Sequence, residues 1–140
     1  DFNDWHDVVS NLKVGGVYPK TPVFYAPAGT PIRFRVAQPG GHARNEVFAL
    51  HGHIWDKEPY VKNSEGLGHN GFSFWEGARM GHGPTNHFDA LIQYGAGGKA
   101  MAPGDYLFRD MASFGFDGGL WGLLWVCDST ERCTRVHSSE

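Results

Sequence analysis

The sequence predicts an all-β protein, a sandwich of short strands, and three observations support this prediction. The chain has 140 residues with 20 glycines and 8 prolines, a composition that favours turns between short strands over long helices. Short runs of apolar or alternating residues recur between these turn signals. The hydrophobic content of 41% and the charged content of 19% are those of a globular chain. At this length we expect one domain with one core.

The expected elements follow one another along the chain. Residues 32–36 alternate apolar and charged side chains, as a half-buried strand does, whereas residues 46–55 are mostly apolar and indicate a strand buried on both faces. Further strands are expected at 72–75, 87–94, 104–109 and 121–126, with a long polar connection at 56–71 and a loop at 81–84. About six or seven short strands are thus expected, and such a number indicates an antiparallel sandwich. The predicted organisation is an irregular lead-in at 1–21, one domain at 22–126 and a polar tail at 127–140.

Charge and cysteine content narrow the function classes. The net charge of −3 offers no basic stripe for nucleic acid, and no apolar run approaches the ~20 residues of a membrane span. Cys127 and Cys133 have the spacing of a local disulfide, which would place the protein in an extracytoplasmic setting, periplasmic or secreted; two reduced buried thiols are the alternative. The start at Asp1 rather than Met suggests a processed chain or a piece of a longer one.

The segment LHGHIW at residues 50–55 contains the main candidate site. His51 and His53 stand one residue apart in a β-prone run, so a strand there would direct both rings to one face. Paired neutral imidazoles most often bind copper or zinc. The alternative is that these histidines form hydrogen bonds to neighbouring loops. We take His51 and His53 as the candidate metal ligands.

Several segments in order resemble one family. They are PAGTP at 27–31, LHGH at 50–53, NHFD at 86–89, PGDYLFRD at 103–110 and DGGLWG at 117–122. Together they resemble a cupredoxin domain of the multicopper oxidases (laccase-like or manganese-oxidase-like), especially the C-terminal domain. This resemblance implies a cupredoxin-like Greek-key β-sandwich. It also implies copper as cofactor, with substrate oxidation at a type 1 copper and dioxygen reduction at a trinuclear cluster between domains.

The family's ligand positions are mostly replaced in this chain. The family's first motif is H-P-x-H-x-H-G-H. Laid on this chain, its type 1 histidine falls on Glu46, its type 2 histidine on Ala49 and a type 3 histidine on His51. His53 matches the last histidine of the motif, which in the family is not usually a ligand of the cluster. Its second motif, H-C-H followed by a histidine and an axial residue, falls on Arg109, Asp110, Met111, Gly115 and Leu120. A blue copper centre needs a thiolate and two imidazoles. The resemblance therefore implies a scaffold without its type 1 site.

Other histidines and carboxylates remain as secondary candidates. His82 and His87 could converge with the LHGH pair, or, like His69, be surface or hydrogen-bonding residues. Glu46 and Asp110 would suit harder ions such as Mn²⁺ or Ca²⁺, although an ion pair with Arg109 is simpler for Asp110. A displaced blue site at Cys133 and His137 lacks the expected methionine and preceding strand.

The expected function is that of a cupredoxin-like domain or subunit of a multicopper-oxidase-like protein, with His51 offered to a metal site shared with partner domains or subunits. Such a chain would be at most part of a copper-dependent oxidase and inactive alone. One alternative is a non-enzymatic metal-carrying or assembly module, and another is a small metalloenzyme that uses His51, His53 and a carboxylate. The five tryptophans and ten phenylalanines fit core filling; a carbohydrate- or partner-binding aromatic surface is the alternative.

Overall fold

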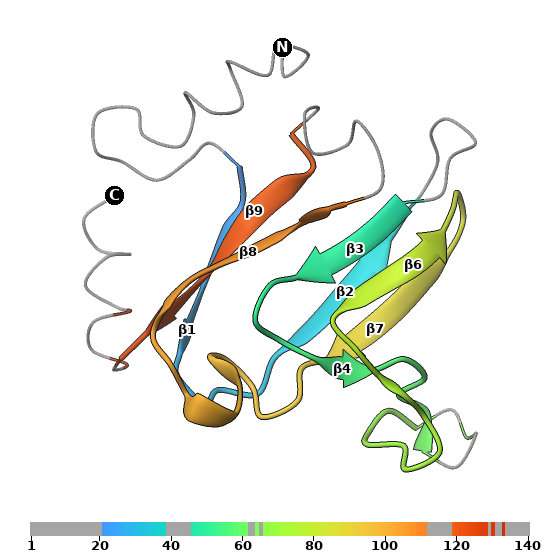
Figure 1. The fold of residues 1–140 in the computed structure, drawn as a ribbon, viewed down its shortest axis with the longest axis horizontal. Coiled ribbons are helices and arrows are strands. Elements are labelled where there is room, and N and C mark those ends of the chain that lie inside the picture. Colours follow the sequence, from blue (N-terminus) through green and yellow to red (C-terminus); the bar gives the residue numbers. More distant parts are fainter. Residues whose placement is uncertain are drawn as a thin grey trace.

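The computed structural model describes residues 21–38, 46–61, 64, 66–111, 119–128, 130 and 133. In this part of the chain nearly all regular structure is β, as predicted, and the strands form two facing layers (Figure 1). The strands are β1 (Val23–Pro27), β2 (Arg33–Ala37), β3 (Glu46–Leu50), β4 (Trp55–Asp56), β5 (Trp75–Glu76), β6 (Ala78–His82), β7 (His87–Leu91), β8 (Gly104–Asp110) and β9 (Trp121–Cys127). A single turn of 3-10 helix, η2 (Gly98–Ala100), precedes β8.

The larger layer is a five-stranded sheet in the order β1-β9-β8-β3-β6. Its central strand pairs are antiparallel, but β1 runs parallel to β9, with Val23 opposite Leu123 and Pro27 opposite Cys127. The expectation of a purely antiparallel sandwich is therefore wrong at this edge. The parallel pair joins the first described strand to the last one.

The smaller layer is the antiparallel pair β2-β7. Alternation in β2 turns Phe34 and Val36 towards the larger sheet and leaves Arg33 and Arg35 exposed, as the sequence pattern predicts. On the outer face Asp89 of β7 receives a hydrogen bond of 3.2 Å from Arg35 Nε. The layer thus presents one apolar and one charged face.

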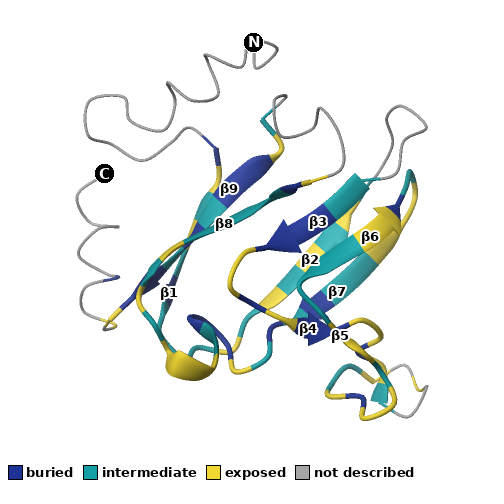
Figure 2. Cartoon of the chain, viewed as in Figure 1, coloured by how far each residue is buried: buried dark blue, intermediate teal, exposed yellow. Residues whose placement is uncertain are grey.

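Aromatic side chains fill the space between the layers. Phe48 of β3 has its ring centroid 5.6 Å from that of Phe34, 5.8 Å from that of Trp55 and 6.1 Å from that of Phe88. The buried cluster comprises Ala26, Phe48, Leu50, Trp55, Ala90, Ile92, Ala96, Leu124 and Val126. Figure 2 shows these buried positions concentrated on the facing strands. Core filling therefore accounts for part of the aromatic content.

The strand bounds differ from the predicted ones at several places. Residues 71–73 form a turn, so the strand predicted at 72–75 is wrong except for Trp75, which begins β5. The strand predicted at 87–94 ends as β7 at Leu91. The predicted strand at 46–55 ends as β3 at Leu50, and residues 55–56 form the separate strand β4. The predicted loop at 81–84 is wrong at its first two residues, because β6 extends through Gly81 to His82 and pairs with β3. Pairing with β3 therefore places the glycine in a strand although its own propensity favours a turn.

Between β4 and β6 the chain leaves the two layers and returns, projecting at one corner (Figure 1). Trp55 and Asp56 pair with Glu76 and Trp75, which closes this excursion at its base. The predicted lead-in, apart from Thr21, and most of the predicted tail lie outside the described residues. In the described part of the chain no helix is long and apolar enough to cross a membrane.

Candidate metal site at the LHGH turn

The LHGH segment forms a turn, not a strand. After β3 the chain reverses at Gly52, whose φ of +72° is a left-handed conformation that glycine adopts at little cost. A Cβ at Gly52 would also meet the Tyr106 ring at 2.9 Å. His51 is exposed, whereas His53 is only 4% exposed. The prediction that both rings share one face of a strand is therefore wrong.

His53 has hydrogen bonds at both ring nitrogens. Its Nδ1 lies 2.9 Å from the carbonyl oxygen of His51, and its Nε2 accepts a hydrogen bond of 3.0 Å from the backbone N–H of Gly97. Because Nε2 accepts, Nδ1 is the nitrogen that carries the proton and donates. The ring also meets Tyr106 edge to face, with centroids 4.5 Å apart. Metal binding at His53 stays a prediction, and it would require the Gly97 bond to break.

His51 is in a different situation. Its backbone N–H donates to the carbonyl of Leu107 at 2.9 Å, which fixes the turn against β8. Within the described residues its imidazole has no hydrogen bond, and the side chain faces solvent. Of the two predicted ligands, His51 is the one whose ring nitrogens are accessible.

Glu46, His82 and Asp110 lie near the other end of β3. Glu46 pairs with His82 across β3 and β6, and Asp110 Oδ1 accepts a hydrogen bond of 2.9 Å from the N–H of Val47. His82 is 8% exposed, and its Nδ1 has no hydrogen-bond partner among the described residues. Burial lowers the pKa of His82, and the nearby Asp110 carboxylate opposes this shift.

The structure therefore places the predicted ligands in separate parts of the sandwich. The five residues of β3 separate Glu46 from His51 by roughly 15 Å at the usual rise of a strand. His87 begins β7, in the other layer, opposite Ala37. Among the described residues no three His, Cys, Asp or Glu side chains come together in a way that could hold a metal ion.

The positions of the family's second motif surround the end of β8. Asp110 is buried, and the N–H of Met111 donates to Val47 O at 3.0 Å, which continues the pairing with β3. Leu120, at the axial position, is exposed, and its carbonyl accepts from the Asp110 N–H. Gly115 lies outside the described residues. Asp110 therefore has a structural partner here, the N–H of Val47.

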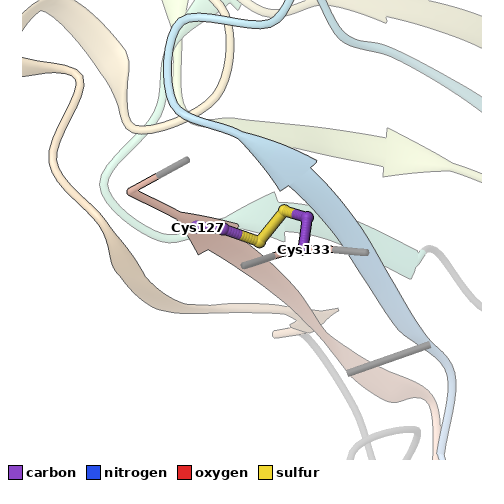
Figure 3. The surroundings of a disulfide bond; sticks show 2 residues. All are labelled: Cys127 and Cys133. Atoms are coloured by element: carbon purple, nitrogen blue, oxygen red, sulfur yellow. A yellow bond between two sulfur atoms is a disulfide. The ribbon is translucent and has the colours of Figure 1, made fainter. Parts of the chain in front are cut away.

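The predicted disulfide between Cys127 and Cys133 is confirmed, with the two Cα atoms 5.6 Å apart (Figure 3). The sequence contains two cysteines, and this bond uses both. The chain therefore has no free thiol. This bond excludes the alternative interpretation, a pair of reduced buried thiols. It also excludes the thiolate that a displaced blue copper site at Cys133 would need.

A second histidine arrangement was not predicted from the sequence. His69 Nδ1 lies 3.0 Å from Oδ2 of the buried Asp56, and its ring stacks on Trp75 with centroids 5.1 Å apart and planes 5° apart. The one available signal was the carboxylate of Asp56 directly after the apolar run, since a buried carboxylate needs a partner. Nothing in the residue spacing identified His69 as that partner.

Comparison with known proteins supports the fold. No protein family matches the chain. No curated protein is similar enough to count as a relative. Among solved structures, a mutant of the laccase from B. aclada has a TM-score of 0.51 at 16% identity, covering 86% of this chain and 21% of the laccase chain. The multicopper oxidase mgLAC has a TM-score of 0.49 at 16% identity, covering 78% of this chain and 31% of its own. The dithionite-reduced auracyanin from the photosynthetic bacterium Roseiflexus castenholzii has a TM-score of 0.46 at 16% identity, covering 77% and 86%.

The likeness to the laccase domain, together with the arrangement of the strands, supports a cupredoxin-like β-sandwich, as predicted from the sequence motifs. At 16% identity they concern the fold alone. The chain matches less than a third of the length of each of the two oxidases.

Proposed function

We propose that this chain is a cupredoxin-like domain or subunit of a multicopper-oxidase-like extracytoplasmic protein and that it has no type 1 copper site of its own. A type 1 site needs a thiolate and two imidazoles. Glu46 and Asp110 occupy two of those positions, and both cysteines are bonded to each other. The described residues therefore do not fit a blue copper ion. The disulfide supports an oxidising compartment.

His51 is the residue through which the chain would take part in metal binding. The observation that supports this role is the contrast within the LHGH turn, where His53 has both ring nitrogens bonded and His51 has neither bonded among the described residues. Copper is the metal we propose, because an accessible neutral imidazole is a suitable ligand. A single imidazole holds a metal weakly, so the other ligands would come from a partner domain or subunit. The isolated chain is then inactive as an oxidase.

The test is metal analysis of the purified native complex together with its mass, followed by copper titration of the isolated chain. We expect weak copper binding without intense blue colour, detected by electron paramagnetic resonance as nitrogen coupling that His51→Ala removes. The matched control is His87→Ala, an exposed histidine in the other layer, which should leave the signal intact. Intense blue absorption with one copper per isolated chain would refute the proposal.

A further inference from the structure

The turn at 70–74, in the excursion between β4 and β6, is held by hydrogen bonds although it projects from the sandwich. Asp56 Oδ2 accepts the N–H of Asn70 at 3.0 Å, and the Asn70 side chain donates to Glu58 O at 3.0 Å. Ser73 Oγ accepts the N–H of Glu58 at 2.8 Å. Arg79 of β6 donates to Lys57 O at 2.8 Å. These bonds join the turn at 70–74 to residues 56–58 and join both to the large sheet.

This hydrogen-bonded turn displays aromatic side chains to solvent. Phe72 is 86% exposed, Phe74 is 80% exposed and Trp75 is 43% exposed. The backbone of Phe72 is fixed by its N–H bond to Asn70 Oδ1, and Phe74 O accepts the N–H of Lys57 at 2.9 Å. Three large aromatic residues within four positions of one hydrogen-bonded turn contribute little to the core, and exposed apolar residues concentrated in this way are typical of a binding surface. Core filling does not explain these three residues.

His69 adds a hydrogen-bonding group to this patch. Its Nδ1 faces the carboxylate of Asp56 and its ring lies flat against Trp75, so two contacts fix the position of the imidazole. With the carboxylate accepting from Nδ1–H, the neutral ring keeps its lone pair on Nε2. The side chain is 62% exposed. The buried carboxylate thus orients a proton-accepting nitrogen next to exposed aromatic rings.

We propose that His69, Phe72, Phe74 and Trp75, here called the aromatic platform, bind a carbohydrate. A sugar ring has an apolar C–H face that packs on aromatic rings and hydroxyl groups that donate to a fixed acceptor, and the platform offers both. A purely apolar protein partner would leave the oriented Nε2 unpaired on burial, which is costly. A metal ion is not favoured, because among the described residues no three His, Cys, Asp or Glu side chains gather to hold one. The site does not depend on His51 or on copper.

The test is affinity electrophoresis of the full chain through gels that each contain hydroxyethyl cellulose, xylan, glycol chitin or soluble starch. We expect retardation by at least one of these polysaccharides. Phe74→Ala should weaken it by about tenfold or more, as loss of an exposed anchor does. His69→Phe keeps a ring against Trp75 but removes the Nε2 acceptor, so it should also weaken binding about tenfold.

Tyr94→Ala is the matched control, because Tyr94 is an exposed aromatic residue outside the platform, and it should bind as the unmodified chain does. Circular dichroism and the urea midpoint confirm that each variant is folded. Absence of retardation in all four gels, or retardation that Phe74→Ala and His69→Phe leave unchanged, overturns the proposal. Self-association of the chain that Phe74→Ala abolishes, without polysaccharide binding, would instead assign the platform to a protein partner and also overturn it.

Discussion

The backbone N–H of Gly97 donates a 3.0 Å hydrogen bond to Nε2 of His53, and this bond ties the turn after β3 to the loop before β8. Gly97 has a φ of +80°, and a Cβ there would collide with the backbone of Ala102. Both ends of the bond are therefore held in place by local geometry. The second histidine of the LHGH turn serves as a structural crosslink.

His53→Ala should lower the free energy of unfolding by about 2 to 4 kcal/mol, because it leaves the Gly97 N–H unpaired and opens a cavity beside Tyr106. Urea unfolding monitored by circular dichroism measures the loss. His51→Ala is the control, since the exposed ring should change stability by less than about 0.5 kcal/mol. Equal losses in the two variants would contradict the assignment of separate roles.

Replacing both cysteines, Cys127→Ser with Cys133→Ser, should lower the free energy of unfolding by about 2 kcal/mol. The bond closes a loop of only six residues' separation, and short loops restrict the unfolded chain least. The same loss should follow reduction of the unmodified chain with dithiothreitol. Complete unfolding on reduction would mean that the sandwich depends on this bond far more than chain entropy explains.

His82 should make the protein less stable in mild acid. Burial lowers its pKa below the ordinary value of 6.5, and the charge of Arg79 acts in the same direction. Hydrogen bonds to the backbone of Arg79 and Glu46 and the Asp110 carboxylate oppose this shift without cancelling it. The unfolded chain then binds a proton more readily than the folded one, so stability falls as pH drops below about 6.5. His82→Gln should flatten this part of the pH profile of the urea midpoint. His87→Asn, an exposed control, should keep the original slope, and an unchanged slope in His82→Gln would refute the role.

Gly122→Ala should cost about 2 to 3 kcal/mol, since an added Cβ would collide with Pro22 O and the ring of Phe108. Gly71→Ala is the matched control, because a Cβ at Gly71 meets nothing within 4 Å. Thermal unfolding of the two variants provides the comparison. Equal melting temperatures would show that β1, β8 and β9 can separate enough to admit a methyl group.

The sequence pattern predicts strands best where alternation and burial agree. The alternating residues of β2 and the apolar run of β9 appear almost where the pattern places them. The pattern fails at β3, because the apolar run continues past Leu50 while Gly52 reverses the chain. It fails again at β6, where pairing with β3 holds Gly81 in a strand. Neither effect can be detected from the periodicity of the local sequence.

The candidate site was predictable in composition but not in geometry. The resemblance to the oxidase motif pointed to His51 and to the replaced positions Glu46 and Asp110, and these positions follow from residue order alone. The hydrogen bond between His53 and Gly97 and the one between His69 and Asp56 join residues that only the fold brings together. The first pair is 44 positions apart in the sequence and the second pair is 13 positions apart. Contacts over such separations are not visible in the local sequence pattern.

The parallel pairing of β1 with β9 has a consequence for how the chain acquires its structure. Val23 meets Leu123, a hundred residues further along the chain, and closing so long a loop is entropically costly and slows folding. During synthesis β1 must wait until β9 has left the ribosome, so the larger sheet can be completed only after residue 127 has emerged. Until then the edge of β8 that pairs with β9 lacks its partner, and an unpaired strand edge exposes the nascent domain to aggregation.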